Sequence, residues 1–103
     1  MFEDYSAFTS ETLTVPSANG TVSLSATKYN QGRGLPTRRA FVTVNPGPPI
    51  SYTMDTTTAS SATGHRATAY GQITIDGYDN IKNFQTTSMS SGTTGSITVT
   101  YYR

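Results

Sequence analysis

The sequence predicts an all-β protein, a single small antiparallel β-sandwich or barrel of the jelly-roll or Ig-like kind with about 7–8 strands. Three observations predict this fold. Apolar and polar residues alternate along short segments. Turn-forming residues separate these segments at roughly 8–12-residue intervals. Residues that suit a half-buried pleated surface are abundant, and Ser and Thr make up about a third of the 103 residues.

The expected strands each present one apolar face. Their inward positions, in chain order, are Leu13 and Val15; Val22, Leu24 and Ala26; Ala40, Val42 and Val44; Ile50, Tyr52 and Met54; Ile73 and Ile75; and Ile97, Val99 and Tyr101. The segment 80–89 is less regular, because Ile81 and Phe84 stand three residues apart, so we expect a bulge or bend there. No segment has helical periodicity over about ten residues or more.

The composition describes one folded domain. The length is that of a single domain. Low apolar content (34%) accompanies disorder when aromatic residues are few and net charge is high, but this chain has seven Tyr, four Phe and a net charge of +1. Residues 11–103 are expected to form the β-sandwich domain. Residues 1–10 lack alternation and are expected to form an N-terminal arm or extra edge element, either docked on a neighbour or frayed.

Several classes of protein are excluded or disfavoured by composition. The absence of cysteine excludes disulfides, thiolate metal sites and cysteine catalysis. The first residues lack the basic and apolar segments of a signal peptide, and no apolar run approaches the length of a membrane span. A net charge of +1 implies no strong attraction to nucleic acid or to an anionic membrane. We therefore expect a protein that is made and used without secretion.

The segment 52–67 contains an aspartate, a run of Thr and Ser, and the single histidine of the chain. A catalytic or metal-binding role for His65 would need partners at a recognisable spacing, and none is present. We interpret the segment as a strand end, a polar loop and the start of the next strand. Asp55 is expected to shape the loop through hydrogen bonds to nearby backbone amides, with His65 structural or interfacial.

The remaining acids do not form a catalytic motif. A glycosidase needs two carboxylates across a cleft, and a sandwich of this size offers little cleft. The segment 76–80 could hold calcium through its oxygen atoms, but Asp76–Gly77 after a strand is more simply a tight turn. We expect no catalytic residue, no metal and no cofactor, and therefore no enzyme.

Two groups of residues are candidates for a protein interface. The first is the aromatic arm of Phe2, Tyr5 and Phe8, and the second consists of Arg33, Arg38 and Arg39. Aromatic residues and Arg are favoured at interfaces, whereas a nucleic-acid module of this size carries a larger basic excess. Glycan binding is the alternative use of the aromatic residues, with Tyr5, Tyr29, Tyr70, Tyr78 and Tyr102 as candidate platforms.

The second half of the chain resembles small structural proteins of tailed bacteriophages. The shared pattern is a strand ending in Tyr-x-x-Asp, a polar loop, Ser-x-x-Gly-His, a strand ending in Gly, Asn-Ile-x-Asn-Phe and a closing strand ending in Tyr. The matching segments are residues 52–55, 61–65, 73–77, 80–84 and 97–101. The chain departs from the pattern at Thr56, where Gly is frequent, and at Ala59, where Pro is frequent.

The resemblance implies a β-sandwich that serves as a non-enzymatic virion structural protein. The role it implies first is a capsid decoration (cement) protein, bound as a homotrimer to the outer shell of a phage head. Its partners would be the major capsid protein and its own copies. It would be located in the virion, which is assembled in the host cytoplasm. A tail, collar or fibre component is an alternative. The Tyr-Thr-x-Asp turn is also similar to one in Ig-like accessory domains of carbohydrate enzymes. A carbohydrate-binding module is therefore a second alternative.

Overall fold

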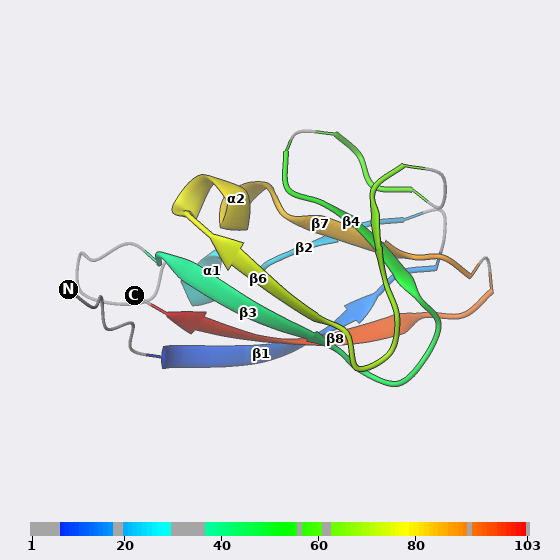
Figure 1. Cartoon of the computed structure of the whole chain (residues 1–103), viewed down its shortest axis with the longest axis horizontal. Helices are drawn as coiled ribbons and strands as arrows, with labels where there is room; N and C mark the ends of the chain where they lie inside the picture. Colours follow the sequence, from blue (N-terminus) through cyan, green and yellow to red (C-terminus); the bar gives the residue numbers. More distant parts are fainter. Residues whose placement is uncertain are drawn as a thin grey trace.

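The computed structural model describes residues 7–17, 20–29, 37–55, 57–60, 63–90 and 92–102, without the side chain of Phe8. These residues form eight strands and two short helices. The strands make two four-stranded antiparallel sheets that lie face to face (Figure 1). The predicted all-β sandwich is therefore confirmed.

Each sheet joins strands that are far apart in the sequence. The first sheet, in spatial order, consists of β1 (Ala7–Val15), β8 (Gly95–Tyr102), β3 (Arg39–Val44) and β6 (Gln72–Asp76). The second consists of β2 (Val22–Ser23), β7 (Gln85–Ser88), β4 (Ile50–Thr53) and β5 (His65–Ala67). The edge strand β1 begins at Ala7, so residues 7–10 belong to it, while residues 1–6 lie outside the described part.

The strand order is that of a jelly roll. Strand β1 pairs with β8, β2 with β7, β3 with β6 and β4 with β5, as if one long hairpin had been wound around the core. Of the two sandwich types predicted, the pairing selects this one. The winding also places four connections at one end of the molecule: those after β1, β3, β5 and β7, described at residues 16–17, 20–21, 45–49, 68–71, 89–90 and 92–94. In Figure 1, β1 begins and β8 ends at the opposite, left-hand end.

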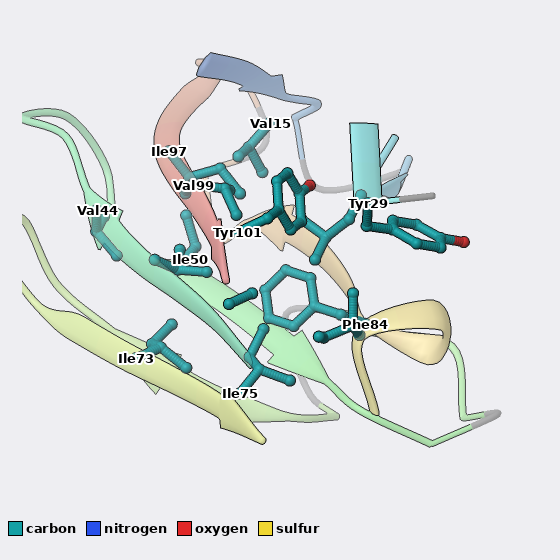
Figure 2. Packing of buried hydrophobic residues seen from close by; sticks show 14 residues of the cluster. Val15, Tyr29, Val44, Ile50, Ile73, Ile75, Phe84, Ile97, Val99 and Tyr101 are labelled. Atoms are coloured by element: carbon teal, nitrogen blue, oxygen red, sulfur yellow. The ribbon is translucent and has the colours of Figure 1, made fainter. Parts of the chain in front are cut away.

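The core lies between the sheets, and the alternation in the sequence creates it. Every second residue of β3 and β8 is buried, and these are the inward positions predicted above. Figure 2 shows aromatic rings, those of Tyr29, Tyr101 and Phe84, at one end of the cluster and Val44 and Ile73 at the other. Burial of this apolar surface supplies the main driving force for folding.

Two segments that the sequence predicted as strands contain helices. The strand expected to continue through Ala26 ends at Ser23, and α1 (Ala26–Tyr29) follows with Ala26 exposed. The carbonyl of Ser25 accepts hydrogen bonds from the N–H groups of Lys28 and Tyr29, which closes this turn. Thr37 Oγ1 donates to the carbonyl of Tyr29 and ties the turn to the chain before β3.

The expected bulge near residue 81 is the second helix. Helix α2 (Tyr78–Asn83) begins after Gly77, whose φ of 97° is readily adopted by glycine alone. Ile81 and Phe84 are both fully buried, and their spacing of three is that of one helix face. The predicted irregular strand over 80–89 is therefore wrong in its first half, and β7 covers the second half.

Candidate functional site

The connection between β4 and β5 borders an open pocket of about 520 Å³. Its lining residues are Thr53, Met54, Asp55, Thr57, Thr63, Gly64 and His65. The pocket therefore lies in the polar segment that contains the single histidine. In Figure 1 this connection passes over the top of the second sheet.

Hydrogen bonds from the sheet hold this connection in place. Ser51 and Thr53 point outward from β4 yet are buried, since the connection covers them. The hydroxyl of Ser51 donates to the carbonyl of Thr63 (3.0 Å), and that of Thr53 donates to the carbonyl of Thr57 (2.7 Å). The N–H of Ala59 donates to Gln85 Oε1 at 3.2 Å. The described residues of this connection thus cover the outer face of β4.

Asp55 shapes the turn that leaves β4. Its Oδ1 accepts a hydrogen bond from the backbone N–H of Thr57 at 2.8 Å, as the sequence analysis expected. The hydrogen bonds from Thr57 lower the pKa of the Asp55 carboxyl, and the nearby His65 lowers it further. Asp55 is exposed and carries a negative charge at neutral pH.

An aromatic ring packs against His65, one of the lining residues of the pocket. The ring of Tyr52 stacks on that of Phe84, with centroids 5.7 Å apart, and contacts the ring of His65 at 5.5 Å. His65 is exposed at the start of the edge strand β5. The pocket thus offers a carboxylate, an imidazole and several hydroxyls to a polar ligand. Among the described residues, no group of three or more acidic or histidine side chains could hold a metal ion.

The predicted interface residues lie partly outside the described chain. Phe2, Tyr5 and Arg33 are outside it, and Phe8 is described by its backbone in β1 alone. Arg38 is exposed, and its N–H donates to the carbonyl of Tyr102.

The described interface candidates lie at the same end of the first sheet. Arg39 in β3 forms an ion pair with Asp76 in β6 at 2.5 Å. Tyr102 of β8 pairs with Ala7 on one side and Arg39 on the other, so the arginines lie two strands from the start of β1.

Of the tyrosines considered as glycan platforms, the structure exposes one. Tyr29 is buried, and Tyr78 lies edge-on against it. Tyr102 is half-buried, and Tyr5 is outside the described part. Tyr70 is 74% exposed, and its φ of 66° is rare for a residue other than glycine. Neither this conformation nor the pocket carries a signal in the sequence, because both depend on how the connections fold.

Comparison with known proteins supplies no family for this chain. Neither models of protein families, nor curated proteins, nor solved structures match it. No helix in the described residues is long and apolar enough to span a membrane. The functional interpretation therefore depends on the fold, the surface and the resemblance in the second half of the sequence.

Proposed function

We propose that this protein is a non-enzymatic virion structural protein, a capsid decoration protein that binds the outer shell of a tailed phage head. The observation that carries the proposal is the strand order, because jelly rolls form viral capsid domains as well as lectin domains. This argument associates a fold with a function. The resemblance in the second half of the chain points to the same kind of function, a structural protein of the virion.

The outer face of the first sheet supports this proposal. Small hydroxyl side chains make up much of it, beside larger side chains such as Phe41 and Tyr102. The small ones are Ser10, Thr12, Thr14, Thr43, Thr74, Ser96, Thr98 and Thr100. Neighbouring strands are linked through them, as in the 3.1 Å hydrogen bond between Ser10 and Thr100. The edge strand β1 thus bears short polar side chains on its outer face, a surface suited to a protein that lies among many copies of its neighbours.

Glycan binding is a second candidate function, and the pocket beside His65 favours it. Sugars are bound by carboxylates, hydroxyls and ring faces, and Asp55, Thr57 and His65 present these groups at one place. Glycan-array binding of the wild-type protein, compared with Asp55→Asn and His65→Ala, tests this function. Binding that both substitutions abolish would support it, and no binding of the wild type would exclude it.

The virion proposal is tested by counting copies. Particles purified from a lysate of the host that carries the gene are analysed by quantitative mass spectrometry, with the major shell protein as the internal reference. We expect copies in the range of the number of capsomers or shell subunits. A few to a dozen copies would place the chain in the tail, collar or fibre, and absence from the particles would contradict a virion role.

A further inference from the structure

Four connections meet at the end of the molecule opposite the arginines. We call this the uncharged end and define it as residues 16–17, 20–21, 45–49, 68–71, 89–90 and 92–94, the described parts of these connections. Backbone hydrogen bonds join these connections to one another and to neighbouring strands. Tyr70 N–H donates to the Val44 carbonyl at 2.7 Å, and Met89 N–H donates to that of Pro49 at 2.9 Å. In Figure 1 the connections after β3 and β7 lie at the right-hand end.

No Asp, Glu, Lys, Arg or His occurs in the sequence of these four connections. In the described part of the chain, most charged residues lie instead around α1, α2 and the strand ends beside them. Examples are Lys28, the Arg39–Asp76 pair, Asp79 and Lys82. Asp55 and Arg66 are exceptions, and Arg66 is exposed in β5, two residues before the connection 68–71. Most charged side chains therefore lie toward one end of the long axis of the molecule. The net charge of the whole chain does not show this uneven distribution.

Tyr70 is the most prominent side chain of the uncharged end. Its ring is 74% exposed, although its backbone has a left-handed conformation that is costly for a side chain of this size. The hydrogen bond from its N–H to Val44 and the neighbouring proline-rich connection 45–49 fix its position. An exposed aromatic ring on a fixed backbone loses little entropy on binding, which is how interface anchors behave.

The chemistry of this end limits what it can bind. Phosphate groups of nucleic acid or lipid need cations, and the four connections contain none, although the exposed Arg66 of β5 stands two residues before one of them. A strongly charged protein surface would lose its hydration here without gaining a partner charge. The amide of Asn45, the polar group best suited to a sugar, is already hydrogen-bonded to Ser96 and Thr98. The partner that fits this end best is an uncharged protein surface, because the cores of protein interfaces are depleted of charge and enriched in aromatic residues.

We propose that the uncharged end is the surface through which this protein docks onto the particle shell, against a contact area of the shell that is likewise uncharged. This inference depends on the virion role proposed above. It places the charged end, with Arg38 and Arg39, away from the shell. The arginine surface considered in the sequence analysis is a competing site at the opposite end, so the two are separable by experiment.

Salt dependence distinguishes the two ends. Particles assembled without the chain, by deletion of its gene, are titrated with the purified protein. An uncharged contact predicts a dissociation constant that changes less than about twofold between about 50 mM and about 500 mM NaCl, because there is no exposed ion pair to screen. Affinity that falls about tenfold or more over this range would contradict docking through the uncharged end.

Matched substitutions locate the contact. Thr93→Glu places a charge on an exposed residue of the uncharged end, and Thr27→Glu places the same charge on an exposed residue of α1. We expect Thr93→Glu and Tyr70→Gly each to weaken binding by about tenfold or more, and Thr27→Glu to leave it unchanged. Circular dichroism and thermal unfolding of each variant show whether it is folded.

The outcomes separate this inference from the virion role. If the wild type binds, and Thr27→Glu weakens this binding while Thr93→Glu does not, docking through the uncharged end is wrong. The proposed virion role would not be affected by that result. Failure of the wild type to bind particles from which the chain was deleted, together with its absence from normal particles, would overturn both.

Discussion

At the scale of single residues, Glu11 and Tyr101 show how a polar pair completes the core. Glu11 lies on the inward face of β1, next to Leu13 and Val15, where an apolar side chain is expected. Its Oε2 accepts the hydroxyl of the buried Tyr101 and also the backbone N–H of Ser25. This carboxylate therefore links β1, β8 and the segment that leads into α1.

Tyr101 is expected to make stability depend on alkaline pH. Burial, followed by the hydrogen bond to Glu11, raises its pKa above the value of about 10 that tyrosine has in an unfolded chain. The folded state thus favours the neutral phenol, and this contribution is present below about pH 10 and lost as pH rises above it. Urea unfolding of Tyr101→Phe should show a weaker loss of stability above pH 10 than the wild type.

The same substitution has a cost at neutral pH. Loss of the hydrogen bond to Glu11 should lower the free energy of unfolding by about 1–3 kcal/mol. Tyr102→Phe, at the neighbouring half-exposed position on the opposite face of β8, serves as the control and should cost less. Equal pH profiles of Tyr101→Phe and the wild type above pH 10 would show that this hydroxyl is not the group responsible.

Tyr70 is expected to be unfavourable for stability. A left-handed backbone costs a residue other than glycine about 1–2 kcal/mol, and an exposed ring offsets little of this cost. Glycine removes that cost but adds entropy to the unfolded chain, worth about 0.4–1 kcal/mol. We therefore expect Tyr70→Gly to unfold at the same temperature as the wild type or higher. A clearly lower melting temperature would mean that the ring stabilises the fold, which would weaken its assignment as a binding residue.

At the scale of elements, the β4–β5 connection depends on one glycine. Gly64 has a φ of 127°, and an added Cβ would lie 2.5 Å from Ser51 Oγ and 2.9 Å from the Tyr52 carbonyl oxygen. This close approach lets the connection return along the sheet and lie over Ser51. The Gly-His pair of the resemblance is therefore explained here by packing of the backbone.

Gly64→Ala should open this connection. Backbone strain and the contact with β4 predict a loss of about 1–3 kcal/mol in the free energy of unfolding. Limited proteolysis should also cut residues 54–64 faster. Gly92→Ala is the matched control, because its added Cβ would meet no atom within 4 Å, and it should be close to neutral. Similar proteolysis of the two variants would contradict the role given to Gly64.

The sequence predicts the long strands well because both of their faces are encoded in it. In β3 and β8 alternate residues are buried and half-exposed, so the period of two is unmistakable. It predicts the short helices poorly. The alternation of Val22, Leu24 and Ala26 predicts a strand, and a turn closed by the Ser25 carbonyl replaces its end. The hydrogen bond from Thr37 to the Tyr29 carbonyl, which ties this turn down, joins residues eight positions apart, and their proximity depends on the tertiary fold.

The candidate sites were predictable to a smaller extent. The hydrogen bond of Asp55 is local and follows from its place at a strand end. The pocket and the uncharged end instead bring together connections that are distant in the sequence, and that grouping follows only from the strand order. Once the jelly-roll order is known, the absence of charge from four connections at one end can be read from the sequence alone.

At the scale of the whole molecule, the residues that carry the resemblance mainly build the fold. Tyr52 and Phe84 stack in the core, and the side chain of Asn80 donates to the carbonyl of Asp76 at the start of α2. These positions of the pattern therefore have a structural explanation within this chain. The surface proposed for docking lies outside most of that pattern, so a difference in partner between similar proteins would be expected to appear in the four connections.

The proposed docking of this chain onto a particle shell through its uncharged end can be tested within assembled particles. Photo-crosslinking within assembled particles tests it most directly, with benzoylphenylalanine placed at Tyr70 in one variant and at the exposed Lys82 of α2 in another. Docking through the uncharged end should give a crosslink to a shell protein from position 70 and none from position 82. A crosslink to the shell from position 82 alone, or from neither position, would contradict it.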